Sequence, residues 1–162
     1  MVSAAAVLGV SDLHEFGSPS WLVAACDISE KVIADSGVDL EGVNYTFGEE
    51  FLDLPARLNP SGAARVGWYV RIADGVVTTK ADPPPDDADT INLCDWEAIE
   101  PLSHHVMGAD PARDAELVTT MVELVSTGKL VRTERNPPSA ALAEALAPLH
   151  NAVVAITGPR QG

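Results

Sequence analysis

The segment VGWYVRIADGVVTTK, which runs from Val66 to Lys80, decides the fold of this chain. Large apolar residues alternate with small or polar ones along its first half, and the pair Asp74-Gly75 separates that half from a second run rich in β-branched residues. Alternation with period two indicates a strand with one apolar face, and Asp-Gly favours the tight turn of a β-hairpin. The segment therefore predicts an antiparallel hairpin, whose apolar face would consist of Val66, Trp68, Val70 and Ile72.

Cap signals indicate three longer helices around this hairpin. Ser18-Pro19 and Asp110-Pro111 each place an N-cap residue before a proline, and proline is favoured at the first helical position. The first of these helices would run to about Asp35 and the second to Gly128. A last helix, near the C-terminus, would be kinked at Pro148 because proline removes a backbone donor.

Shorter patterns predict the remaining elements of the chain. They are a strand at 43–54, a strand at 89–93, a short helix at 96–102 and a strand at 129–134. The apolar faces of strands and helices must cover one another to form a core. We therefore expect an α+β fold, with a single antiparallel-rich sheet and helices packed on one face.

The length of 162 residues fits one domain and is sufficient to bury a core. We expect an N-terminal segment at 1–17, a single domain at 18–158 and a C-terminal tail at 159–162. The apolar stretch Met1–Val10 has no Lys or Arg before it and is too short to span a bilayer. We expect it to be a mobile or loosely packing segment without a targeting role.

The chain is strongly acidic, with a net charge of −14 from 24 acidic and 10 basic residues. Nucleic acids and anionic membranes need clustered Lys and Arg, so we expect no nucleic-acid partner and no stable membrane insertion. The two cysteines, Cys26 and Cys94, show neither a disulfide framework nor metal-ligand spacing, which suits a reducing cytoplasm. Cys26 lies on an apolar helical stripe and is expected to be a small buried hydrophobe.

Glu49 is the first candidate for chemistry, because the sequence has no phosphate loop, zinc ligand set or nucleophile elbow. On a regular strand Glu49 would point in the same direction as Phe47 and Phe51. Burial would then raise its pKa, as a general acid or base requires. A bulge at Gly48 would instead return Glu49 to solvent, which agrees with the rarity of unpaired buried carboxylates.

His104 and His105 form the second candidate. Adjacent histidines point in different directions and seldom bind one metal together, so we expect no metal site. Either ring could carry protons at the mouth of a pocket. The alternative is a plain surface position, which is where most polar residues lie.

Several motifs, taken in order, resemble those of sterol-carrier-protein-type (SCP-2-like) lipid-binding domains. The hairpin is followed by ADTINL at 88–93 and DWEAI at 95–99, and STGKLV at 126–131 leads into the last strand before a terminal helix. The resemblance covers residues 43–154. It implies a five-stranded sheet with helices over one face and an apolar tunnel between them. In such proteins the tunnel holds fatty acids, acyl-CoA esters, sterols or similar molecules.

The residues and the resemblance together predict a small cytoplasmic carrier for an apolar small-molecule ligand, without a cofactor. Burial of hydrocarbon would supply the affinity. The expected ligand-binding residues are Phe47, Phe51, Trp68, Val70, Ile72, Met121, Val125, Leu142 and Leu146. The same spacing also suits an ordinary packed core, and this alternative stays open.

Two other functions stay open as well. The first is a small enzyme, an isomerase or hydrolase of a hydrophobic substrate, with Glu49 as general base and His104 or His105 assisting. The second is an accessory subunit whose apolar face docks on a larger protein. A homodimer is a further option that the sequence leaves open.

Overall fold

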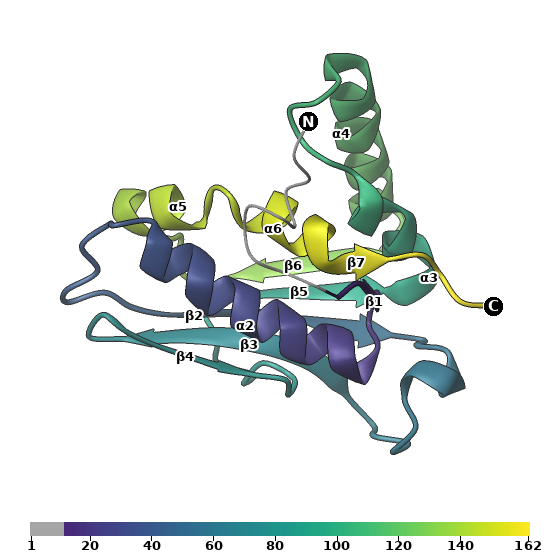
Figure 1. Ribbon diagram of the computed structural model, residues 1–162, viewed down its shortest axis with the longest axis horizontal. Helices are drawn as coiled ribbons and strands as arrows, with labels where there is room; N and C mark the ends of the chain where they lie inside the picture. The colour runs from purple at the N-terminus through teal and green to yellow at the C-terminus, as the bar shows by residue number, and fades with distance from the viewer. Residues whose placement is uncertain (1–11) are drawn as a thin grey trace.

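A five-stranded sheet with helices on one face forms the body of the protein, as the computed structural model of residues 12–162 shows (Figure 1). The strands are β2 (Asn44–Leu52), β3 (Val66–Ala73), β4 (Val76–Lys80), β5 (Thr90–Asp95) and β6 (Leu130–Glu134). Their order is β4-β3-β2-β5-β6, and only β2 and β5 run parallel. The predicted α+β class is confirmed, whereas the expectation for Met1–Val10 falls outside the described residues.

The predicted hairpin forms between β3 and β4. Asp74 and Gly75 have positive φ angles of 53° and 77°. Positive φ at both central residues is what a type I′ turn requires, and Asp tolerates it better than most side chains. Trp68, Val70 and Ile72 are buried, so the predicted apolar face of the hairpin is confirmed.

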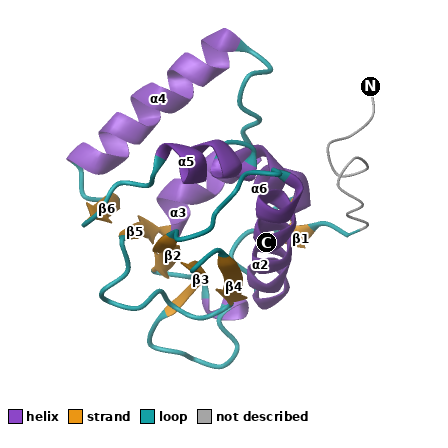
Figure 2. Ribbon diagram, turned by 90° about the vertical axis from the view of Figure 1, so that its left-hand side faces the viewer, coloured by secondary structure: helices purple, strands orange, loops and turns teal. Residues whose placement is uncertain are grey.

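Helices α2, α5 and α6 lie over the apolar face of the sheet (Figures 1 and 2). The hydroxyl of Ser18 caps α2 by accepting a hydrogen bond from the backbone N–H of Trp21 at 3.2 Å. Pro148 separates α5 from α6, as the sequence predicted. The helices are α2 (Pro19–Asp35), α3 (Trp96–Ile99), α4 (Pro111–Ser126), α5 (Ala140–Leu146) and α6 (Leu149–Ile156), with 3-10 turns η1 (Ala56–Leu58) and η2 (Glu100–His104).

Helix α4 projects away from the sheet (Figure 1). Its predicted N-cap is confirmed, because the Asp110 carboxylate accepts from the backbone N–H of Ala112 at 3.0 Å. No residue of α4 is buried, and Val118, Val122 and Val125 are more than half exposed. One edge of this helix therefore meets the body of the protein, while its valine stripe faces solvent.

A short parallel pair joins the two ends of the described chain, β1 (His14–Glu15) with β7 (Thr157–Gly158). Beside it the Trp21 indole N–H donates to Thr157 Oγ1 at 2.9 Å. Phe16, Trp21 and Phe51 pack edge to face, with the Phe16 ring centroid 4.7 Å and 5.1 Å from the other two. This aromatic cluster fastens α2 and the β1 segment to the sheet.

Cys26 and Cys94 are both buried free thiols. Burial raises the pKa of Cys26 to about 11, so this thiol is a packing residue, as predicted. Between residues 12 and 162, no helix has both the length and the apolar character needed to cross a membrane.

Candidate functional site

A row of polar side chains crosses the helix-covered face of the sheet. Glu49 on β2 lies opposite Trp68 on β3 and opposite Asn92 on β5, and Asn92 lies opposite Arg132 on β6. Directly opposed residues of neighbouring strands point to the same face, so these four side chains lie side by side. We call them the polar row. The neighbouring row is apolar and consists of Val66, Phe51, Cys94 and Leu130.

Gly48 does not form the bulge that was considered from the sequence. The pairing of β2 with β3 continues in register through Gly48, which lies opposite Tyr69. A Cβ at Gly48 would lie 2.7 Å from the Cβ of Tyr69 and 3.0 Å from the Cβ of Pro84. The glycine therefore permits close packing on the far face of the sheet, and Glu49 keeps the inward direction of a regular strand.

The Glu49 carboxylate is partly buried and is held by one neighbour. Its Oε2 accepts a hydrogen bond from the Trp68 indole N–H at 3.1 Å. Trp68 is itself fixed edge to face against Trp21, with ring centroids 6.3 Å apart. Loss of hydration raises the pKa of Glu49, and the Trp68 hydrogen bond opposes part of that rise.

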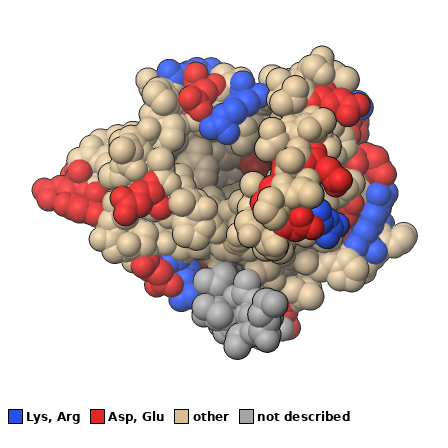
Figure 3. Space-filling view, turned by 90° about the horizontal axis from the view of Figure 1, so that it is seen from above, with Lys and Arg blue, Asp and Glu red and all other residues tan. Residues whose placement is uncertain are grey.

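Two adjoining pockets meet at Glu49. The polar pocket, of about 280 Å³, lies over the polar row and is also lined by Tyr45, Phe47, Thr90 and Leu146. The apolar pocket, of about 500 Å³, is lined mainly by Phe16, Ile99, Leu102, Met107, Met121 and Val154. Glu49, His150 and Val153 line both, which makes the two pockets one cleft between sheet and helices. Seen from above, the protein is hollowed near its middle, with largely uncharged walls and charged side chains on the rim (Figure 3).

The ligand-binding residues predicted from the sequence fall into three groups. Those that line the cleft are Phe47, Trp68, Met121 and Leu146. Those packed in the core, and lining neither pocket, are Phe51, Val70, Ile72 and Leu142. Val125 is 56% exposed on α4 and lines neither pocket. The second group is closed off because α2 packs on β3 and α5 packs on α2, which buries these side chains in the core.

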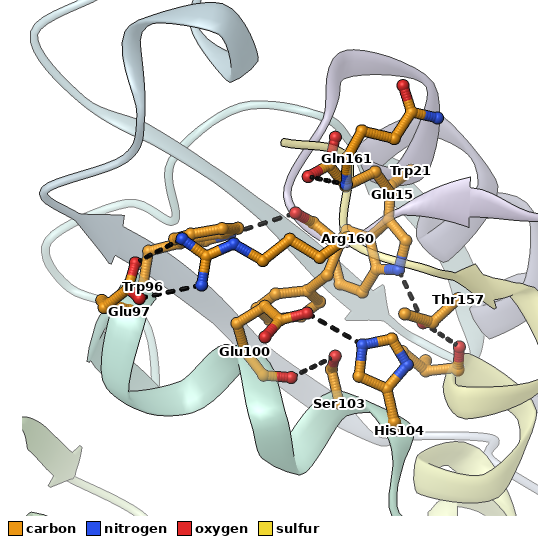
Figure 4. A network of polar contacts seen from close by, with 12 residues as sticks. Glu15, Trp21, Trp96, Glu97, Glu100, Ser103, His104, Thr157, Arg160 and Gln161 are labelled. Atoms are coloured by element: carbon orange, nitrogen blue, oxygen red, sulfur yellow. Dashed lines mark hydrogen bonds and ion pairs between the residues drawn. The ribbon is translucent and has the colours of Figure 1, made fainter.

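His104 and His105 lie away from Glu49. His104 Nε2 is 2.8 Å from Glu100 Oε1, as Figure 4 shows, and His105 Nε2 is 2.8 Å from Asp114 Oδ1. Both rings border a hollow of about 440 Å³ between η2 and α4, which shares Leu102 and Leu117 with the apolar pocket but is not lined by Glu49. In the described part of the chain, no group of three or more His, Cys, Asp or Glu residues could hold a metal ion.

His150 and Asn92 are cleft residues that the sequence analysis missed. His150 on α6 lines both pockets, and its Nε2 lies 2.7 Å from the backbone oxygen of His105. The sequence could have indicated His150, because it follows Leu146 by four positions and precedes Val153 by three, the spacing of residues on one helix face. Asn92 could have been predicted too, because alternate residues of a strand point to one face and Asn92 lies two positions from Cys94, which points inward.

The C-terminal tail folds back onto the domain beside this region (Figure 4). The Arg160 guanidinium lies 4.9 Å from the centre of the Trp96 ring and makes two hydrogen bonds, of 2.8 and 2.9 Å, to Glu97. The backbone N–H of Gln161 donates to Glu15 Oε1 at 3.0 Å. Residues outside the expected domain range of 18–158 therefore contribute contacts to the domain.

The arrangement of strands and helices matches that of a protein of known structure. The crystal structure of sterol carrier protein 2 aligns with a TM-score of 0.50 and 15% identity over 88% of this chain and 100% of that chain. This chain has a sterol-carrier-protein-2-like fold. A conserved hypothetical protein of Thermus thermophilus, described as a possible sterol carrier protein, aligns over 94% of this chain and 97% of that chain, with a TM-score of 0.48 and 15% identity.

A larger enzyme contains a partly similar region. The inverting sec-alkylsulfatase Pisa1 of Pseudomonas sp. aligns with a TM-score of 0.34 and 16% identity over 68% of this chain but 14% of that chain. No protein-family model and no curated protein sequence matches the chain.

Proposed function

We propose that the protein binds an apolar small molecule in the cleft and carries it without covalent chemistry. The apolar pocket is the observation that supports this most. Its volume of about 500 Å³ and its lining of aliphatic, aromatic and methionine side chains are typical of a small-molecule site. A ligand there would gain about 25 cal/mol for each Å² of apolar surface that it buries.

The fold supports the same proposal. The cleft lies between the sheet and the helices, which is where the resemblance to sterol-carrier-protein-type domains placed an apolar tunnel. The solved structure with this fold is named a sterol carrier protein, and a carrier role for this chain agrees with that name.

The two histidines that the enzyme hypothesis paired with Glu49 do not line its cleft, where the histidine present is His150. The histidines considered as partners of Glu49, His104 and His105, are each paired with another carboxylate. Both line the hollow between η2 and α4, and neither lines the polar or the apolar pocket. Glu49 therefore lacks the assisting groups that the enzyme hypothesis assigned to it.

Titration with the neutral dye Nile red, followed by its fluorescence, tests the proposal. We expect a saturable increase in fluorescence with the folded protein, displacement by an apolar compound such as dodecane or lauryl alcohol, and no saturation with urea-unfolded protein. Native mass spectrometry of the same samples should show one bound dye per chain. A linear, unsaturable signal together with a mass spectrum of unliganded protein would overturn the proposal.

A further inference from the structure

Two side chains of the polar row have hydrogen-bonding capacity that the described protein leaves unused. The Glu49 carboxylate accepts one side-chain hydrogen bond, from Trp68 to Oε2, among residues 12–162. Asn92 lines the polar pocket beside Glu49, and its amide makes no side-chain hydrogen bond within the same range. Among the described residues no buried side-chain nitrogen or oxygen lacks a hydrogen-bond partner, so the unpaired atoms of Glu49 and Asn92 are open to solvent in the pocket. A ligand that displaces water from these atoms loses affinity unless it replaces the hydrogen bonds of that water.

The two groups are complementary to a hydroxyl. An ionised carboxylate only accepts hydrogen bonds, whereas a carboxamide also offers two N–H donors. A hydroxyl both donates and accepts, so it can donate to Glu49 Oε1 and accept from Asn92 Nδ2. Glu49 and Asn92 occupy opposed positions on β2 and β5, which brings their side chains next to each other. One hydroxyl group can therefore satisfy both residues.

An anionic head group suits this place less well. A ligand carboxylate beside Glu49 would place two carboxyl groups side by side in a poorly hydrated site, where like charges repel. The cation of the polar row, Arg132, already donates through Nε and Nη2 to Glu134 Oε2, at 3.2 and 2.9 Å. The net charge of −14 adds a repulsive field for any anion that approaches the protein.

The hydrocarbon of such a ligand has a place directly beyond the polar row. The apolar pocket begins at Glu49, because Glu49, His150 and Val153 belong to both pockets. From there its walls continue along Met121 and Val154. A head group at Glu49 would therefore direct the hydrocarbon into the larger pocket.

We propose that Glu49 and Asn92 bind the hydroxyl group of a neutral apolar alcohol, whose hydrocarbon lies in the apolar pocket. This inference rests on the proposed function and adds the chemical class of the ligand to it. It gives Glu49 a binding role in place of the catalytic role considered from the sequence.

Displacement of Nile red by ligands that share one alkyl chain tests the inference. The competitors are dodecane, lauryl alcohol, lauric acid and dodecylamine, each in the same mildly alkaline buffer. In the wild type we expect lauryl alcohol to bind at least about tenfold more tightly than lauric acid, the ratio expected for one charge-assisted hydrogen bond.

Two variants and one control test whether the preference for lauryl alcohol over lauric acid comes from the polar row. Glu49→Gln keeps an acceptor for the Trp68 indole and removes the charge, so lauric acid should bind about tenfold more tightly than to the wild type. Asn92→Leu should weaken lauryl alcohol several-fold and leave dodecane unchanged. Glu123→Gln makes the same charge change on the exposed side of α4 and should leave every ratio unchanged. Circular dichroism checks that each variant is folded.

The outcomes separate the inference from the function on which it rests. Lauric acid or dodecylamine binding more tightly than lauryl alcohol would overturn the hydroxyl assignment, while the proposed function would stand. An alcohol preference that survives Glu49→Gln unchanged would overturn the role of Glu49. If neither Nile red nor any of the four competitors binds the folded wild type, the proposed function is wrong and the inference is wrong with it.

Discussion

Trp68 and Glu49 lie opposite each other on β3 and β2, and the Trp68 indole N–H donates to Glu49 Oε2 at 3.1 Å. This contact orients a carboxylate at the point where the polar and apolar pockets meet. It leaves the second carboxylate oxygen without a side-chain donor from the described residues. The chemistry of the cleft and the stability of the fold should therefore both depend on Glu49.

Glu49→Gln should stabilise the protein at neutral pH. Burial raises the pKa of Glu49 in the folded state, so the folded protein holds this proton more tightly than the unfolded chain does. The resulting stability is fully present below the ordinary pKa of Glu and is lost as the pH rises through the raised, folded-state pKa. Gln avoids that loss, and thermal unfolding should show a Tm gain of about 2–4 °C per kcal/mol at neutral pH and little gain in acid.

The surroundings of Glu49 make this pH dependence specific. Behind Glu49, burial and the Glu49 charge both raise the pKa of the Cys94 thiol on β5. The other ionisable side chains of the polar pocket are Tyr45, Arg132 and His150, and all of them remain in both proteins. Glu123→Gln, on the exposed side of α4, should leave the Tm profile unchanged. Equal Tm values for Glu49→Gln and the wild type at every pH would contradict a buried charge at Glu49.

Trp68→Phe should cost more in the wild type than in Glu49→Gln. The substitution removes the indole donor and leaves a partly buried carboxylate without its hydrogen bond, a loss of about 1 kcal/mol in addition to lost packing. In Glu49→Gln the same hydrogen bond is made to a neutral amide, so its loss costs less free energy of unfolding. A double-mutant cycle from urea unfolding at neutral pH should give a coupling of about 1 kcal/mol. Strictly additive effects would show that the two side chains do not interact.

Gly48→Ala should destabilise the fold, by about 1–3 kcal/mol. The added methyl group would press against Tyr69 and Pro84 on the far face of the sheet. Thr46→Ala, two positions earlier on the same face of β2, serves as the control and should have a smaller effect. Urea unfolding measures both. An unchanged free energy of unfolding for Gly48→Ala would indicate a bulged strand and a different direction for Glu49.

Met121→Glu should weaken ligand binding, whereas Val122→Glu should not. Met121 lines the apolar pocket, so a carboxylate there would have to lose its hydration when a ligand fills the pocket. Val122 is the next residue of α4 and is 64% exposed, which makes it a matched control for charge and helix propensity. Nile red titration should show a loss of at least about tenfold in affinity for Met121→Glu alone. Equal affinities for the two variants would place the ligand elsewhere.

Local sequence patterns were sufficient to predict most of the fold. The Asp74-Gly75 turn, the caps at Ser18 and Asp110 and the break at Pro148 each have a local physical cause, and the structure confirms all four. Local patterns could not predict that α4 projects away from the sheet. An apolar stripe indicates that a helix has a face to bury, but the stripe does not say whether this chain supplies a covering surface.

The cleft itself was only partly predictable. The alternation of side chains along a strand placed Phe47, Glu49 and Trp68 on one face of the sheet. Alternation alone also allowed a bulge at Gly48, which would have turned the Glu49 side chain to the opposite face. That choice was decided by Pro84, which packs on the opposite face and comes from a distant loop. The division of apolar residues between packed core and pocket depends on how closely α2 and α6 approach the sheet, which is a tertiary property.

An apolar ligand in the cleft would lie against the Trp68 indole, so this group is the most direct probe of binding. A nuclear magnetic resonance titration of the protein, labelled with nitrogen isotope, would follow the indole N–H signals of Trp68 and Trp96 as lauryl alcohol is added. Trp68 lines the polar pocket and bonds Glu49, whereas the indole N–H of Trp96 is bound to the backbone oxygen of Phe16. We expect a saturable shift of the Trp68 signal that exceeds the shift of the Trp96 signal. A Trp68 signal that does not move at saturating lauryl alcohol would show that this ligand does not occupy the cleft.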